Sequence, residues 1–140
     1  MTKRTKIVLM LLSLAVISMI LSGCKQDKPT LYVYNWGDYI DETIIGEFEK
    51  ETGIKVVYDS YATNEDMYVK LKAGGSSYDV IFPSDYMLTR MLEEDMLEKI
   101  DLTKIPNAKY IEERFMGNEY DPNNEYSLPY MWGTVGILYN

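Results

Sequence analysis

The distribution of apolar and polar positions divides the chain into short strand-like runs separated by helical repeats. Runs rich in aromatic and β-branched residues predict β-strands at 31–35, 54–60 and 78–82. Apolar positions spaced three or four apart predict amphipathic helices at 42–52, 65–73 and 85–96. After residue 97 only 134–140 is predicted as a further strand. This alternation favours an α/β fold, with a mixed, mostly parallel sheet and helices on both faces.

Residues that start and stop helices support these bounds. Asp41, Asn64 and Ser84 stand where caps are expected, because their side chains can accept hydrogen bonds from the first N–H groups of a helix. Gly53 and Gly74 stand where the first two helices should end. The third helix carries an apolar stripe that is expected to be buried, namely Met87, Leu88, Met91, Leu92 and Met96.

The order of the strands determines which loops meet. Right-handed crossovers commonly place the first strand between the second and the third, in the order 2-1-3. The carboxyl ends of the first and third strands then form a crevice, the usual ligand position in open α/β sheets. The motif "NWGDY" (35–39) follows the first strand, and "PSDY" (83–86) follows the third. We therefore expect Trp36 and Ser84 to lie at one crevice.

The first 24 residues have the features of a bacterial lipoprotein signal. A basic start is followed by an apolar run at 7–21 and by "LSGC" (21–24). The run is shorter than the roughly 20 residues that a membrane span needs, although a single membrane anchor or a buried helix is the alternative. The pattern predicts a signal peptide over 1–23, lipidation of Cys24, and a tether over 24–30 on the outer face of a bacterial cytoplasmic membrane. Such a protein is periplasmic in a Gram-negative source.

Cleavage of this signal makes an acidic chain more acidic. The net charge is -8 at pH 7, and it becomes -11 because three cations and no acid lie in residues 1–23. Negative charge repels nucleic acid and anionic lipid, which argues against a DNA or RNA partner and is compatible with a cationic ligand. Cys24 is the only cysteine, so no disulfide or cysteine-based metal site is predicted.

The residue types expected at the crevice suggest a class of ligand. A cation over the ring of Trp36, Tyr39 or Tyr86 gains about 0.5 to 2 kcal/mol. The same ring faces can cover methylene groups, worth roughly 0.8 kcal/mol each when buried. Asp38 and Asp85 add negative potential, whereas helix amino termini alone would favour an anion. The chemistry therefore leans toward an elongated cation with an apolar body and charged ends.

Each of these residues also has a purely structural explanation. Trp36 and Tyr39 can pack in the core or at a hinge. Ser84 can cap a helix, donate or accept a hydrogen bond to a ligand, or do both. Asp38 suits a solvated turn, and Asp85 in the first turn of a helix suits the helix dipole.

Other functional classes fit the same crevice less well. Ser84 is the only candidate nucleophile there, but the chain contains no His and has no Lys near Ser84 in sequence to act as its base. A surface-anchored hydrolase could use Asp38 and Asp85 as paired carboxylates, and the same scaffold could hold an oligosaccharide or an oxyanion. A calcium loop starting at Asp121 is rejected because Tyr126 replaces the required glycine. No enzyme activity, cofactor or metal is predicted.

Five segments resemble the extracytoplasmic spermidine/putrescine-binding proteins of bacterial polyamine ABC importers. They are "LYVYNWGDYI" (31–40), "EFEKETGIKVVYDSY" (47–61), "NEDMYVKLKAG" (64–74), "YDVIFPSDYML" (78–88) and "DPNNEYSLPYMWGT" (121–134). The resemblance implies a type II periplasmic-binding-protein fold, in which 31–140 is the N-terminal lobe and the second lobe is absent. It also implies a monomer that binds putrescine or spermidine and docks on the membrane permease of an ABC importer.

The resemblance further implies roles for individual residues. In that family the polyamine site is lined by residues matching Trp36, Tyr39, Ser84 and Tyr86. Asp38 and Asp85 lie in the same two motifs, at positions where a ligand role is less defined. Gly37 stands where relatives often carry a larger polar residue, so any side-chain hydrogen bond from that position is lost here.

Overall fold

The computed structural model describes residues 28–74, 77–134 and 136–139. The predicted signal peptide over 1–23 and the predicted lipidation site at Cys24 lie outside the described residues. Within the described ranges, no helix is both long enough and apolar enough to cross a membrane.

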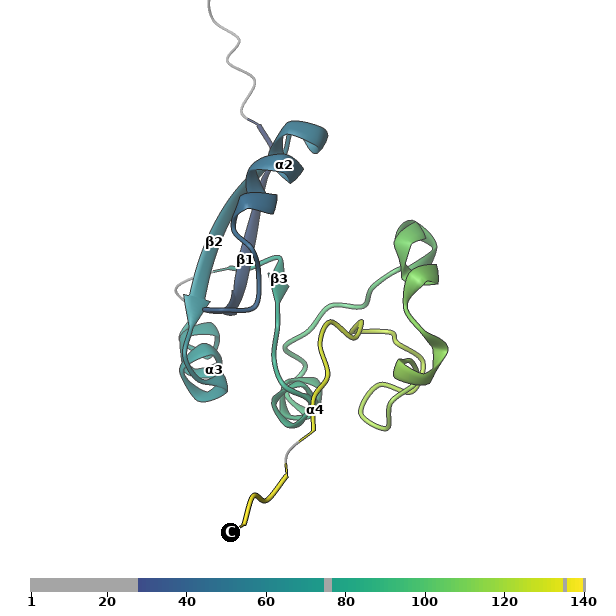
Figure 1. Cartoon of the computed structure of the whole chain (residues 1–140). Helices are drawn as coiled ribbons and strands as arrows, with labels where there is room; N and C mark the ends of the chain where they lie inside the picture. The colour runs from purple at the N-terminus through teal and green to yellow at the C-terminus, as the bar shows by residue number, and fades with distance from the viewer. Residues whose placement is uncertain (1–27, 75–76, 135, 140) are drawn as a thin grey trace, which may run out of the picture.

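A parallel sheet of three strands forms the centre of the fold (Figure 1). Its strands are β1 (Thr30–Trp36), β2 (Lys55–Tyr61) and β3 (Val80–Ile81). The order β2-β1-β3 is the one predicted from right-handed crossovers. β1 pairs with β2 along its whole length, whereas β3 contributes only two residues, which lie opposite Val33 and Tyr34.

In the described part of the chain three α-helices accompany the sheet, namely α2 (Thr43–Thr52), α3 (Asn64–Lys72) and α4 (Asp85–Glu93). The step from β1 to β2 and the step from β2 to β3 run in opposite directions, so right-handed crossovers are expected to leave toward opposite faces of the sheet. In Figure 1, α2 lies along β1 and β2, while α3 and α4 lie beyond the carboxyl ends of the strands. The predicted α/β fold class is confirmed.

The chain after α4 forms no further sheet in its described part. It contains short 3₁₀ helices, η1 (Leu102–Lys104), η2 (Pro106–Tyr110) and η3 (Glu113–Phe115), joined by turns. The predicted strand at 134–140 is wrong for residues 134 and 136–139, which have no regular structure. A strand is held by hydrogen bonds to a neighbour, but here Ile137, Leu138 and Tyr139 are almost fully exposed.

The predicted caps of α2 and α4 behave differently from expectation. The cap position of α2 is Glu42, whose side chain makes no cap bond, while Asp41 Oδ1 accepts from the N–H of Thr43 at 2.9 Å. Ser84 occupies the cap position of α4 as predicted, yet its side chain makes no cap bond. α4 also ends at Glu93 rather than at residue 96.

The predicted cap of α3 is wrong by one residue. The cap is Thr63, whose extended backbone lets its hydroxyl accept from the N–H of Asp66 at 3.1 Å. Asn64 is already the first helical residue. Its side chain is therefore available for bonds elsewhere in the fold.

The core lies between the sheet, α3 and α4, and it consists of tyrosines and methionines. Its buried members are Tyr34, Tyr61, Met67, Tyr68, Met87 and Met91. Met87, Leu88 and Met91 confirm the predicted stripe of α4, with Leu92 and Met96 partly buried.

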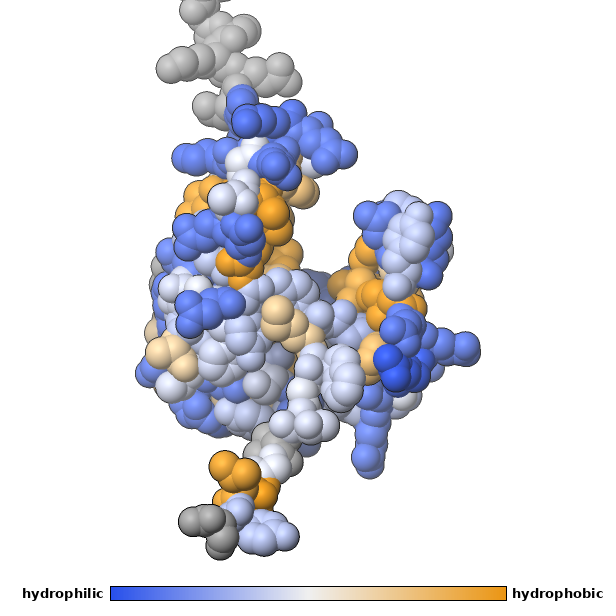
Figure 2. Space-filling model, viewed as in Figure 1, coloured by the Kyte–Doolittle hydropathy of each residue, from blue (hydrophilic) through white to orange (hydrophobic). Residues whose placement is uncertain are grey.

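By contrast, α2 has no buried residue. Its Ile44 and Phe48 are exposed, and Figure 2 shows apolar residues over this helix.

A charged hydrogen-bond network joins the carboxyl ends of α3 and α4. The Glu94 carboxylate accepts bonds from the Lys72 ammonium, from the Tyr68 hydroxyl at 2.7 Å, and from Arg90 Nε at 3.2 Å. These bonds, led by the one from Lys72, lower the pKa of Glu94 from 4.5 to about 2. The Arg90 guanidinium also lies 4.0 Å from the ring centroid of Tyr68. The network fixes α4 against α3.

Glu94→Gln should destabilise the protein in a pH-dependent way. The folded-state pKa of Glu94 is below its ordinary value, so its contribution is complete above about pH 4.5 and is lost as the pH falls toward 2. We expect the variant to melt a few degrees lower at pH 7, with the difference disappearing near pH 2. Thermal unfolding followed by circular dichroism at several pH values measures this, with the exposed Glu93→Gln as control. A difference that does not change with pH would contradict the assignment.

Candidate functional site

The carboxyl ends of β1 and β3 meet at one backbone carbonyl. Phe82 O accepts a hydrogen bond from the indole Nε1 of Trp36 at 2.9 Å and a second one from the hydroxyl of Tyr61. Burial raises the pKa of Tyr61, so its hydroxyl stays protonated and continues to donate. The segments 35–39 and 83–86 are thereby brought together, as the strand order predicts.

The ring of Trp36 lies between the core and the surface. It packs against Tyr61, with ring centroids 4.8 Å apart, and against Tyr39, with centroids 5.7 Å apart and 32° between the ring planes. Trp36 is partly buried, whereas Tyr39 is 40% exposed. Because the indole N–H is bound to Phe82, what remains for a ligand is apolar ring surface. Trp36 therefore packs partly against the core, as its structural explanation predicts.

The loop that carries Tyr39 is held by a residue that the sequence did not single out. The hydroxyl of Tyr130 donates to the backbone carbonyl of Tyr39 at 2.5 Å. The Tyr130 ring also packs edge-on against Phe82 with centroids 4.7 Å apart. Within this loop Asp38 is exposed, and a Cβ added at Gly37 would meet nothing within 4 Å. A side chain would therefore fit at position 37, so lack of space does not explain the glycine there.

Ser84 and Tyr86 are both held by Asn64. The Ser84 N–H donates to Asn64 Oδ1 at 3.1 Å, and Asn64 Nδ2 donates to the Tyr86 hydroxyl at 2.9 Å. The same hydroxyl donates to Glu65 Oε1 at 3.1 Å. Sequence reasoning assigned Asn64 to a helix cap and missed this role, because the partners lie on another helix.

The predicted box of three aromatic rings is not closed. Trp36 and Tyr39 form a pair, but no ring pair involving Tyr86 occurs in the described part of the chain. The hydroxyl of Tyr86 is directed toward α3 by its bonds to Asn64 and Glu65, and the residue is 56% exposed. Asp85 Oδ1 accepts from the N–H of Tyr86 at 2.7 Å, which is a local bond in the first turn of α4.

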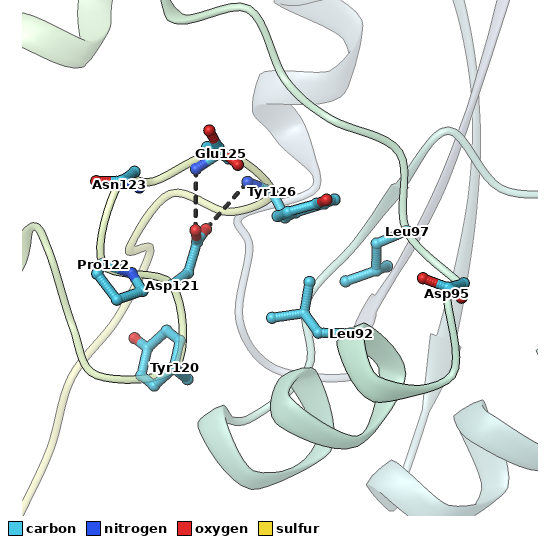
Figure 3. A pocket seen from close by; sticks show the side chains of 9 residues that line it. All are labelled: Leu92, Asp95, Leu97, Tyr120, Asp121, Pro122, Asn123, Glu125 and Tyr126. Carbon is cyan, nitrogen blue, oxygen red and sulfur yellow. Dashed lines mark hydrogen bonds between the residues drawn. The ribbon is translucent and has the colours of Figure 1, made fainter.

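The candidate site is an open wall rather than a cavity. One hollow, of about 270 Å³, lies between the end of α4 and the loop 120–126 (Figure 3). There the Asp121 carboxylate accepts from the N–H groups of Glu125 and Tyr126 at 2.9 and 3.0 Å. Burial acts to raise the pKa of Asp121, but hydrogen bonds led by that of Tyr126 outweigh it and lower the pKa. This carboxylate is therefore used to fold its own loop.

A second hollow of about 560 Å³ lies at the other end of β1, beside Thr30, Tyr32 and Tyr78. Neither hollow contains the residues around Trp36 and Ser84. Within the described ranges, no group of three or more acidic, histidine or cysteine side chains is placed to hold a metal ion.

The chain is similar to a family of bacterial proteins and to several individual members. Residues 35–140 match the family described as bacterial extracellular solute-binding protein. The putrescine-binding periplasmic protein SpuD of Pseudomonas aeruginosa is 47% identical over 116 residues, which is 81% of this chain and 32% of that protein. The spermidine/putrescine-binding periplasmic protein of Salmonella typhimurium is 44% identical over 115 residues, or 81% and 33%. The chain spans about a third of the length of these curated relatives.

Solved structures agree with this similarity. A spermidine/putrescine ABC transporter protein from Listeria monocytogenes is 51% identical with a TM-score of 0.72, over 74% of this chain and 32% of that one. The spermidine/putrescine transporter substrate-binding protein of Streptococcus pneumoniae is 45% identical with a TM-score of 0.73, over 75% and 32%.

Tyr61→Phe should weaken the junction between the carboxyl ends of β2 and β3. The substitution removes one of the two donors to Phe82 O, and the carbonyl keeps its bond from Trp36. We expect a loss of about 1 kcal/mol in the free energy of unfolding, measured by chemical denaturation. Tyr58→Phe is the matched control, because the Tyr58 hydroxyl donates to Trp36 O over a long distance of 3.4 Å and does not reach Phe82 O. An equal loss in both variants would contradict a special role for the Phe82 carbonyl.

Proposed function

The chain belongs to the family of bacterial extracellular solute-binding proteins, and on that basis we propose that it forms the N-terminal lobe, over 31–140, of a protein that captures putrescine or spermidine. The captured polyamine is then delivered to the membrane permease of an ABC importer. The relative at 44% identity is named for binding spermidine and putrescine, and the relative at 47% for binding putrescine, and this supports the choice of ligand.

The observation that carries the proposal is the way the aromatic side chains are oriented at the carboxyl ends of β1 and β3. The polar groups of Trp36 and Tyr86 are bonded to the protein, at Phe82 and at Asn64. Ring faces are therefore the surface left for a solute. Such faces suit methylene groups and ammonium ions, the two components of a polyamine.

Individual roles follow from this geometry. We assign the pair of Trp36 and Tyr39 to the methylene chain, because the two rings contact each other and Trp36 packs against the core. Tyr86, whose ring is more than half exposed, is assigned to an ammonium group. The Ser84 hydroxyl makes no cap bond, so it can accept a hydrogen bond from an ammonium N–H. The loop residues Gly37 and Asp38 and the helix residue Asp85 border this surface.

We propose that the protein is not catalytic. Its relatives are named as binding proteins, and one similar structure is that of an ABC transporter substrate-binding protein. Within the described residues, Asp85 is engaged with the backbone of Tyr86, and the chain contains no histidine that could activate Ser84.

The location of the protein follows from the family and from the first residues. Members of the family are extracellular by description. We propose that residues 1–23 act as a lipoprotein signal, that Cys24 is lipidated, and that 24–30 tether the lobe to the membrane. Two acyl chains give stable membrane attachment where one chain gives only marginal binding.

Loss of a ring face should reduce polyamine affinity without unfolding the protein. We expect Trp36→Ala and Tyr86→Ala each to weaken binding of putrescine or spermidine by at least about tenfold, since each removes both apolar cover and cation–π attraction. Titration calorimetry of the full-length protein measures this. Tyr110→Ala, at a tyrosine that is 74% exposed on η2, is the matched control.

Two results would argue against the proposal. The proposal would be wrong if the unsubstituted protein bound neither putrescine nor spermidine and bound a sugar or an amino acid instead. Unchanged affinity in the Trp36 and Tyr86 variants would assign these rings to folding alone.

Lipid attachment should depend on the thiol of Cys24. In bacteria that express the full-length protein, we expect Cys24→Ser to move it from the membrane fraction to the soluble fraction. Ser22→Ala is the control, because it keeps a small residue before the cysteine and should leave the protein in the membrane. Membrane retention of Cys24→Ser, measured by fractionation and detergent phase partition, would contradict lipidation at this residue.

A further inference from the structure

The amino terminus of α3 is joined to the candidate site by one buried side chain, that of Asn64. This residue is only 3% exposed although it is polar. A buried amide is costly unless both its oxygen and its nitrogen find partners. Here the oxygen accepts from the N–H of Ser84 and the nitrogen donates to the hydroxyl of Tyr86. Both partners are residues that we assign to the ligand.

The start of α3 does not need Asn64 as a cap. Thr63 supplies the cap, because its hydroxyl accepts from the N–H of Asp66. Both hydrogen bonds of the Asn64 side chain are therefore directed to α4 and the turn before it, 20 and 22 residues further along the chain. An amide suits this position because it is an acceptor and a donor at once.

The bond to Asn64 also restricts the ring of Tyr86. A tyrosine that is 56% exposed would otherwise have considerable rotational freedom. Its hydroxyl accepts from Asn64 and donates to Glu65, so the far end of the ring is fixed on two sides. The cost of ordering this side chain is then met when the protein folds and does not reduce affinity when the ligand binds.

We propose that Asn64 is a positioning residue, which couples the Ser84 turn to the Tyr86 hydroxyl and so prepares this part of the wall for its ligand. The inference rests on the proposed polyamine site and adds a residue to it. Asn64 acts through Ser84 and Tyr86 and does not itself touch the ligand.

A double-mutant cycle tests the coupling in the full-length protein. The variants are Asn64→Ala, Tyr86→Phe and the combination, with putrescine and spermidine titrated by calorimetry. We expect each single change to weaken binding by about five- to tenfold, and the double change by no more than about twice the larger single effect. If the affinity losses of the two single variants multiply in the double variant, the two residues act independently and the coupling is overturned. Loss of thermal stability without any change in affinity would overturn it too.

Thr63→Ala is the matched control for damage to the helix end. It removes the actual cap of α3, so it should lower the melting temperature while leaving affinity unchanged. An affinity loss in Thr63→Ala as large as in Asn64→Ala would overturn the proposal, because it would show that any disturbance of this helix end weakens binding.

Amide hydrogen exchange of the unsubstituted protein keeps the proposal testable if Asn64→Ala does not fold. We expect the Ser84 amide to be protected in the ligand-free protein, with little further protection on adding polyamine. Protection that appears only with ligand would show that the wall is not prepared in advance. If the unsubstituted protein binds neither polyamine, the proposed function itself fails. Binding without coupling removes only the role of Asn64.

Discussion

The candidate site depends on the hydrogen bonds that the backbone carbonyl of Phe82 accepts. The ladder between β3 and β1 has two residue pairs, which is short for a strand that must place a ligand-binding turn. Beyond the last residue of β3, Phe82 is bonded to Trp36 of β1 and to Tyr61 of β2. A shift of this carbonyl would therefore move both the aromatic pair after β1 and the Ser84 turn after β3.

The pair of helices beyond the sheet is held at both ends by polar contacts. At the amino end, Asn64 of α3 bonds to the first residues of α4 and the turn before it. At the carboxyl end, the Glu94 carboxylate accepts hydrogen bonds from Tyr68 and Lys72 of α3. Buried methionines fill the space between these two contacts, and their flexible side chains pack well in irregular spaces. Hydrogen bonds thus set the orientation of the helices, while the apolar core supplies the driving force.

The arrangement of the aromatic side chains determines what the wall can recognise. The polar groups of Trp36 and Tyr86 are bonded to the protein, so the exposed ring surface of the wall offers dispersion and cation–π attraction. On an exposed surface a cation–π contact is worth about 0.5 to 1 kcal/mol, and it reaches about 2 kcal/mol when water is excluded. An open wall of this kind therefore binds a small cation strongly only when another surface covers it.

The sequence by itself determined the elements from β1 to α4, their order and the place where the two motifs meet, because periodicity and crossover handedness are properties of local chain geometry. Its predicted strand at 134–140 was wrong for the described residues. It also placed Trp36 and Ser84 at one crevice, whereas the structure brings their two segments together at the Phe82 carbonyl and has its two hollows elsewhere. It placed the α3 cap one residue late, since Thr63 and Asn64 can make the same local bond and only the fold shows which one does. The contacts of Asn64 with Tyr86 and of Tyr130 with Tyr39 join residues 22 and 91 positions apart. Only the tertiary structure decided these, because a hydrogen bond between distant residues depends on where the packed helices and loops place the two groups.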